Sequence, residues 1–164
     1  MPLTSLDDLF NNGLRDMYYA EKKLLRVLPR MAKASANERL AEAFQNHLAE
    51  TETQVERLEK VFDLVDQKPR AKKCPAMDGL IEEGNEVLKG AKEENVKDAG
   101  LLAAGQAVEH YEIARYGTLI AWADELGRDD VVRLLTTNLN EEKAADKKLS
   151  TVALRKGVNR KAAS

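Results

Sequence analysis

Residues 106–127, with the sequence QAVEHYEIARYGTLIAWADELG, decide the fold of this chain. As a helix, the segment has one face made of apolar or small residues, and the carboxylates of Glu109 and Glu112 lie one turn apart on that face. Tyr116 and Leu119 continue the face towards Gly127, which suits the left-handed conformation that ends many helices. The pattern predicts a long helix with two acids turned into the protein.

The composition favours helices throughout. The chain has 164 residues, which suits a single domain (1–164) with a substantial core. It is 43% hydrophobic and 33% charged with only four prolines, a mixture typical of long amphipathic helices. The formal net charge of -2 provides no basic field, so nucleic acid is not an expected partner. The sequence predicts an all-α protein.

Neither end of the chain nor its apolar runs suggest a membrane or secreted protein. The first residues, MPLTSLDDLF, lack the basic and apolar regions of a secretory signal, and no apolar run is long enough to span a membrane. The single cysteine, Cys74, has no partner for an intramolecular disulfide and is interpreted as a linker residue. We expect a soluble cytoplasmic protein with no membrane contact.

Capping residues and apolar spacing divide the chain into four long helices and one short helix. Residues 66–76, DQKPRAKKCPA, contain two prolines and are expected to form a linker. Residues from about 155 form a basic tail, expected to be frayed and solvated. The first long helix should start after Thr4 or Ser5 and the second after Ser35 or Asn37. The long helices are expected at about 5–34, 37–65, 95–127 and 129–154, with the short helix starting near Pro75.

The lengths of the connections predict how the helices are arranged. Short turns join the first two and the last two long helices, so each pair should be an antiparallel hairpin. The connection between the second and third long helices spans about 30 residues, including the short helix. A connection of that length can cross the bundle from end to end and leave these two helices parallel. This is the topology of a ferritin-like four-helix bundle, with an additional short helix in the crossover.

Every long helix carries polar residues halfway along its apolar stripe. Glu21 interrupts the first helix, and a block from His47 to Gln54 interrupts the second. Buried carboxylates without a positive partner take up protons, and no Lys or Arg lies on these stripes. A pair of cations would balance the charge, and oxygen ligands suit Fe, Mn, Mg or Ca better than Cu or Zn. The candidate carboxylates are Glu21, Glu50, Glu109, Glu112, Glu142 and Asp146.

Four segments of the chain resemble a known family. HLAETETQVERL, MDGLIEEGNEVL, VEHYEIARYGTL and LNEEKAADKKL are similar to the signature segments of the bacterial ferritin-like family typified by the stress-associated proteins YciE and YciF. The likeness extends from YYAEKKLL to DKKL, nearly the whole chain. The resemblance implies a ferritin-like bundle that forms a homodimer and takes part in stress responses.

The resemblance also implies a dinuclear iron centre, with manganese as the alternative metal. Its usual Glu-x-x-His partners are absent here, because Thr53 and Ala145 occupy those positions. His47 and Asp146, each one turn from a ligand, are candidate replacements. A reaction with O2 or peroxide is one activity of such a centre, and the alternative is a structural or interaction bundle in which metal is only stabilising or absent. The implied ligands are Glu21, Glu50, Glu109, Glu112 and Glu142, with Glu50 and Glu142 bridging.

Other polar residues near these stripes have two interpretations each. Tyr18 and Tyr116 lie one turn from candidate ligands and are candidates to hydrogen-bond them, although tyrosines are frequent in bundles. Gln54 is a candidate neighbour of the site. His110 lies on another face, where small residues favour close helix packing or a subunit contact. That strip comprises Ala103, Ala107, Ala114, Gly117 and Ala121.

Overall fold

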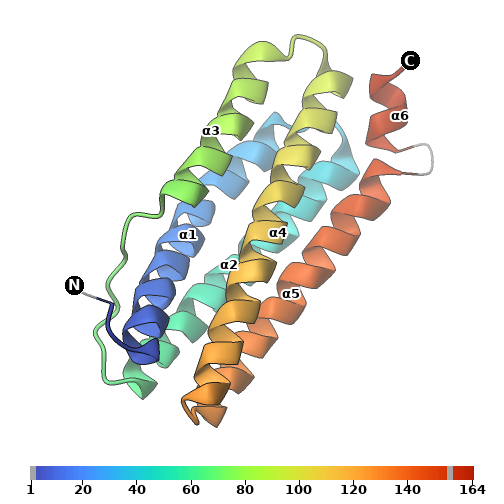
Figure 1. The fold of residues 1–164 in the computed structure, drawn as a ribbon. Helices are drawn as coiled ribbons and strands as arrows, with labels where there is room; N and C mark the ends of the chain where they lie inside the picture. Colours follow the sequence, from blue (N-terminus) through green and yellow to red (C-terminus); the bar gives the residue numbers. More distant parts are fainter. Residues whose placement is uncertain (1–2, 155–156) are drawn as a thin grey trace.

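The computed structural model describes residues 3–154 and 157–164, and within them the chain forms helices and no strand (Figure 1). This confirms the predicted all-α class. None of the described helices is long and apolar enough to cross a membrane. The long helices are α1 (Leu6–Ala34), α2 (Glu38–Leu64), α4 (Glu94–Glu125) and α5 (Asp129–Ala153), and the shorter ones are α3 (Pro75–Gly90) and α6 (Val158–Ala162).

The helix ends follow the local sequence. Ser5 caps α1: its hydroxyl accepts a hydrogen bond from the Asp8 amide, and the Asp8 carboxylate accepts one from the Ser5 amide. The Asn37 side chain accepts hydrogen bonds from two first-turn amides of α2, at 3.1 and 3.2 Å. Gly127 has a φ of +68° after the end of α4, as its position predicted.

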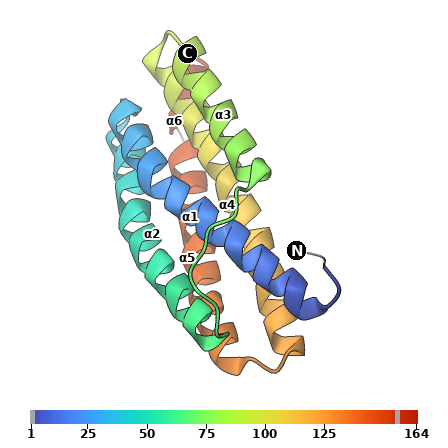
Figure 2. The ribbon, with the colours of Figure 1, turned by 90° about the vertical axis from the view of Figure 1, so that its left-hand side faces the viewer.

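The four long helices pack as a closed ring, because α1 and α5 each contact both α2 and α4. The chain leaves α2 at one end of the bundle and returns through an extended linker and α3 to the other end (Figures 1 and 2). Helices α2 and α4 therefore run in the same direction, while α1–α2 and α4–α5 are antiparallel hairpins. This confirms the predicted ferritin-like crossover.

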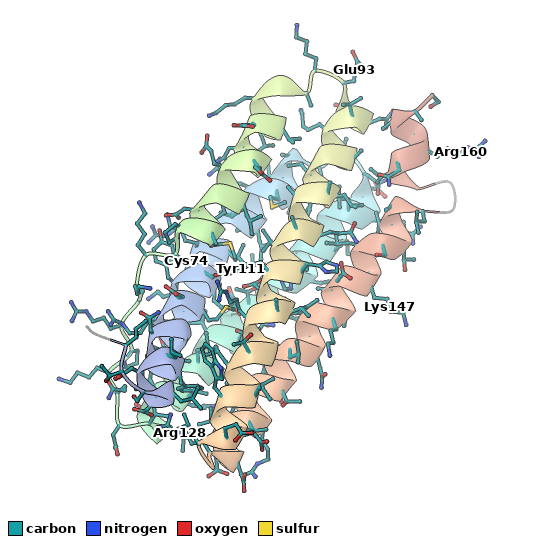
Figure 3. The ribbon with its side chains drawn as sticks, viewed as in Figure 1. Cys74, Glu93, Tyr111, Arg128, Lys147 and Arg160 are labelled. Carbon is teal, nitrogen blue, oxygen red and sulfur yellow. The ribbon has the colours of Figure 1, made fainter. Side chains whose placement is uncertain are left out.

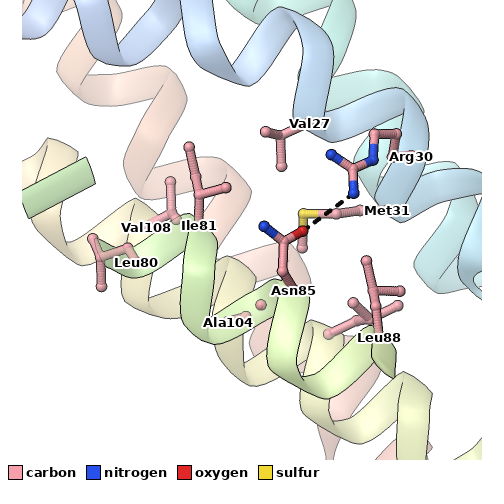
Figure 4. A pocket seen from close by; sticks show the side chains of 11 residues that line it. Val27, Arg30, Met31, Leu80, Ile81, Asn85, Leu88, Ala104 and Val108 are labelled. Atoms are coloured by element: carbon pink, nitrogen blue, oxygen red, sulfur yellow. Dashed lines mark hydrogen bonds between the residues drawn. The ribbon is translucent and has the colours of Figure 1, made fainter. Parts of the chain in front are cut away.

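Helix α3 packs against α1 and α4 on the outside of the ring. A Cβ at Gly100 would lie 2.5 Å from Cγ1 of Val87, so the glycine permits the close approach of α3 to α4. A small, mainly apolar cavity remains between α1, α3 and α4, where an Arg30 NH group donates to Oδ1 of Asn85 at 3.2 Å (Figure 4). The crossover is attached to the bundle by apolar packing and by hydrogen bonds to α1, among them one from the Tyr19 hydroxyl to Asp78 at 2.8 Å.

The C-terminal tail differs from the expectation of a solvated end. Helix α6 packs on α4 and α5, and Val158 is only 1% exposed. Burial of this one side chain attaches a segment whose Arg160 and Lys161 remain exposed. The basic composition of the tail concealed this apolar anchor. Arg155 and Lys156, part of the same predicted tail, lie outside the described residues.

The apolar core consists of two clusters separated by a polar layer. One cluster includes Phe10, Leu14 and Phe62 in one half of the bundle, and the other includes Leu24 and Phe44 in the other half. Along every long helix, buried polar residues fall between members of the two clusters, as the interrupted stripes predicted. The polar layer comprises Glu21, His47, Thr51, Gln54, Glu109, Glu112, Asn138 and Glu142, each at most 3% exposed.

Candidate metal centre

Four side chains of the polar layer converge from three helices. His47 on α2, Glu109 and Glu112 on α4, and Glu142 on α5 each offer one ligand atom, and these atoms lie within 4.8 Å of one another. Nε2 of His47 is 3.2 Å from Oε1 of Glu109 and 3.4 Å from Oε2 of Glu142. Neither contact is aligned as a hydrogen bond, and Nε2 has no hydrogen-bond partner. The donor set is therefore one imidazole and three carboxylates.

Glu21 on α1, also a predicted ligand, belongs to the polar layer but not to the four residues whose donor atoms converge. Its side chain is fully buried, and Oε1 accepts a hydrogen bond from the Tyr116 hydroxyl. Burial raises the pKa of Glu21, and repulsion from Glu142 raises it further. The polar layer thus receives an acidic side chain from α1, α4 and α5.

Most carboxylate oxygens in the polar layer lack a hydrogen-bond partner. They are both oxygens of Glu112, both of Glu142, and one each of Glu21 and Glu109. No Lys or Arg is buried among the described residues. Buried polar atoms are nearly always paired, so these unpaired oxygens are available as ligands for a cation.

Burial makes these acids hold protons strongly when no cation is present. Desolvation, followed by repulsion from neighbouring carboxylates, raises the pKa of Glu21 to about 8 and also places the pKa of Glu112 well above its usual range. Desolvation also raises the pKa of Glu109 to about 8. For His47, burial lowers the pKa, but the hydrogen bond to Glu50 and the nearby acids outweigh it and the net shift is upward. Cation binding would displace these protons.

A chain of hydrogen bonds leads from the surface into the polar layer. An Arg57 NH group donates to Oδ1 of Asn138 at 3.0 Å and to Oε2 of Glu141 at 2.7 Å. Nδ2 of Asn138 donates to the Tyr116 hydroxyl oxygen at 3.0 Å, and that hydroxyl donates to Glu21. This chain fixes the orientation of the Glu21 carboxyl group.

Two further predicted ligands, Glu50 and Asp146, also lie outside the convergent set. Glu50 has a side chain that is 41% exposed, and its Oε2 is 3.3 Å from Nδ1 of His47. Oδ1 of Asp146 accepts a hydrogen bond from Gln106 at 3.1 Å and is 3.2 Å from Nε2 of the exposed His110. Neither belongs to the four residues whose ligand atoms converge, although Asp146 still raises the pKa of Glu109.

Of the two candidate tyrosines, Tyr116 contacts the polar layer and Tyr18 does not. The Tyr18 hydroxyl donates to Oε1 of Glu59 at 2.7 Å, and its ring packs edge-on against Phe62. Tyr18 lies one turn from Glu21. Its hydroxyl group nevertheless lies outside the polar layer, in a partly buried position between Glu59 and Lys22. Sequence spacing set the height of the side chain along the bundle but not the direction of its hydroxyl group.

Cys74 has a larger structural role than that of a linker residue. Its buried side chain caps α3 by accepting a hydrogen bond from the Met77 amide at 3.5 Å. Its sulfur also lies 2.9 Å from the Tyr111 hydroxyl oxygen, and the two side chains meet between α3 and α4 (Figure 3). Pro75 is the first residue of α3, and proline is common at that position. The residue before it, Cys74, therefore lies where a cap is expected.

Two buried polar residues were missed by sequence reasoning. Asn138 lies one turn before Glu142 on the inward stripe of α5, so its spacing could have identified it. Asp98 on α4 accepts hydrogen bonds from the amides of Ala36 at 2.9 Å and Asn37 at 2.8 Å. It holds the α1–α2 turn against α4, and no local pattern signals a partner so distant in sequence.

Known proteins resemble the chain over nearly its full length. It is 47% identical to Protein YciF of Escherichia coli (strain K12) over 163 residues, which cover 99% of this chain and 98% of the relative. The crystal structure of that E. coli stress protein matches with a TM-score of 0.89 over 92% of this chain and 96% of the other. YcfI of Rhodopseudomonas palustris, described as a candidate structural protein, matches with a TM-score of 0.90 and 55% identity. The match covers 92% of this chain and 96% of the other.

The chain also resembles a more distant structure and matches a family model. A protein of Xanthomonas campestris pv. campestris, XCC3681, shares the fold with a TM-score of 0.71 at 18% identity, over 90% of this chain and 89% of the other. The model of a domain of unknown function, DUF892, matches residues 5–163. This chain is therefore a member of the DUF892 family, to which it is joined by fold and by sequence along almost its whole length.

Proposed function

We propose that this protein binds a dinuclear iron centre, or a manganese centre, in its polar layer and acts as a stress-associated ferritin-like protein. The observation that supports this most is the set of unpaired carboxylate oxygens that face one another at His47, with no buried Lys or Arg among the described residues. Two divalent cations would bring four positive charges to the four buried carboxylates. The mixture of carboxylates with one imidazole suits iron or manganese.

The proposed ligands differ in how well their geometry supports the assignment. His47, Glu109, Glu112 and Glu142 have convergent donor atoms, and Glu21 adds an unpaired oxygen beside them. For Glu50 and Asp146 the support is weaker, because Glu50 is half-exposed and Asp146 is already paired with Gln106 and His110. We assign the first five as principal ligands and keep the other two as peripheral ones.

A bound iron pair would supply one-electron redox chemistry towards O2 or peroxide. The residues of this chain contribute orientation and the exclusion of water. Tyr116 holds the Glu21 carboxyl group in place and is itself oriented by Asn138. The two apolar clusters shield the polar layer from solvent along the bundle axis.

Metal content is the direct test. Protein purified without chelator should contain about two iron or manganese ions per chain, as two-metal carboxylate sites do. The double variant with Glu109→Gln and Glu112→Gln should lose most of this metal, since it removes two charges and two ligands. A matched pair of exposed changes, Glu93→Gln and Glu94→Gln at the start of α4, should retain it. Metal-free wild-type protein that also fails to bind added Fe2+ or Mn2+ would refute the proposal.

A structural role is the second candidate. The resemblance to YcfI, described as a candidate structural protein, favours it. In that case the cations would only join the helices, and the protein would consume no peroxide. Metal at full occupancy without peroxide turnover would support this alternative over a redox function.

A further inference from the structure

A cleft between α2 and α5 leads from the surface to the polar layer. His47 and Glu109, both buried, lie at its inner end, while Glu50 and Lys148 lie at its exposed rim. Helix α5 contributes Ala144 and Ala145 to the wall of this cleft. Small side chains at this wall keep the cleft open beside the convergent donor atoms.

Glu50 connects the rim of this cleft to its inner end. Its side chain is 41% exposed, yet Oε2 is 3.3 Å from Nδ1 of His47. The other ring nitrogen of His47, which has no hydrogen-bond partner, faces Glu109 and Glu142. An anionic side chain at the surface is thus linked through one buried ring to unpaired carboxylate oxygens.

We propose that this cleft is the port by which hydrated divalent cations enter the polar layer, with Glu50 as the first ligand that they meet. The inference rests on the proposed metal site and adds the route to it. At the rim, the Glu50 carboxylate replaces water around the cation. The cation would then pass to His47 and Glu109 at the inner end, whose donor atoms converge with those of Glu112 and Glu142. Lys148 at the rim opposes entry through its positive charge.

The rate of cation loading tests the port separately from the existence of the site. Chelator-stripped protein is mixed with Co2+, and the visible absorption of bound Co2+ is followed in a stopped-flow instrument. Ala145→Leu should fill the cleft and slow loading severalfold, with the same final stoichiometry. Ala144→Leu, on the exposed part of the same wall, should also slow loading and is less demanding for folding. Ala49→Leu, exposed on α2 and outside the cleft lining, should load at the wild-type rate.

Two neighbouring lysines supply a charge test with an internal control. Lys148 lines the cleft, whereas Lys147 lies on the outer face of α5 (Figure 3). Lys148→Glu should accelerate Co2+ loading on the order of tenfold at low ionic strength, because local charge steers cations to a site. Lys147→Glu makes the same change in net charge and should accelerate it much less.

The outcomes separate the port from the site. If wild-type protein binds Co2+ but both alanine variants load at its rate and the two lysine variants behave alike, the cations enter elsewhere and the port is refuted. If wild-type protein binds no Co2+, the proposed function fails and the port fails with it. Slow loading of both alanine variants at full final occupancy supports the port.

Discussion

The hydroxyl group of Tyr116 on α4 donates a hydrogen bond to Oε1 of Glu21 on α1, across the centre of the bundle. Both side chains are fully buried, and the same hydroxyl oxygen accepts a hydrogen bond from Asn138 on α5. Three of the four long helices are therefore joined at one phenolic oxygen. The other oxygen of Glu21 remains unpaired in the polar layer.

Removing this hydroxyl should destabilise the metal-free protein. Tyr116→Phe leaves Glu21 with two unpaired oxygens and takes one of two acceptors from Nδ2 of Asn138, which keeps the Gln54 carbonyl oxygen at 3.4 Å. We expect the free energy of unfolding to fall by about 1–3 kcal/mol, the cost of leaving buried polar groups unpaired. Urea denaturation measures this. Tyr18→Phe is the matched control, since its hydroxyl bonds Glu59 outside the polar layer, and it should leave metal affinity unchanged. Equal effects of the two variants on metal affinity would argue against a role for Tyr116 beside the site.

An apolar residue in place of one buried acid should have opposite effects on stability and metal binding. Glu109→Leu removes a ligand and replaces a buried carboxyl group that has an unpaired oxygen by an apolar side chain, so the metal-free protein should gain about 1–3 kcal/mol of stability. Metal affinity should fall sharply, and with it the stabilisation by added Fe2+ or Mn2+. Glu125→Leu, exposed at the end of α4, should change neither quantity by much. Full metal occupancy in Glu109→Leu would exclude this residue from the site.

The stability of the metal-free protein should fall as pH rises from about 5 to 8. The pKa values of Glu21 and Glu109 are about 8 in the folded state against 4.5 as reference, so the folded protein binds more protons than the unfolded chain in this window. The folded state therefore has its full stability below the pKa of the unfolded chain. It loses stability as the pH rises through the pKa of the folded state, because these buried carboxyl groups then become charged. Urea midpoints across the window measure the slope, which Glu109→Leu should reduce.

Metal affinity should show the opposite dependence on pH. Ligands must lose their protons before they bind a cation, so affinity should rise over the same window. Isothermal titration with Mn2+ in buffers of different ionisation enthalpy would report the protons released. A metal affinity that does not change between about pH 5 and 8 would contradict the protonated state inferred for the polar layer.

We also expect the protein to be a closed two-fold dimer that uses the outer face of α4. Ala103, Ala114 and Ala121 are exposed along this face, and a Cβ added at Gly117 would meet nothing within 4 Å. A strip of small residues permits two helices to approach closely. Sedimentation should give a dimer at micromolar concentration, and Ala114→Arg should shift it to monomer. A monomeric wild-type protein, or a cage of many subunits, would contradict this.

The sequence predicted the fold well because the relevant signals are local or depend on chain length. Ser5, Asn37 and Gly127 occupy helix ends whose capping chemistry is specific. The length of the connection after α2 indicated the parallel arrangement of α2 and α4. The height of the polar layer along the bundle followed from helical periodicity in each long helix.

The remaining features depend on packing between distant segments. The direction of the Tyr18 hydroxyl, the burial of Val158 in a basic tail and the contacts of Asp98 with the α1–α2 turn all require knowing which helix lies opposite. Periodicity also treated Glu50 and Glu109 alike, whereas their exposure differs because Glu50 lies at the rim of a cleft. Such differences arise from rotation of each helix about its own axis, which a stripe of residues defines only coarsely.

The division of the apolar core into two clusters has a consequence for how the protein opens. Without cations, the two half-bundles meet through a layer in which most carboxylate oxygens are unpaired, so we expect each half to fluctuate as a separate cooperative unit. With cations, ligands from all four helices are tied at one height, and the halves become a single unit. Amide hydrogen exchange would then show two classes of protected amides in the metal-free protein, divided at the level of Glu21, merging into one when the site is filled.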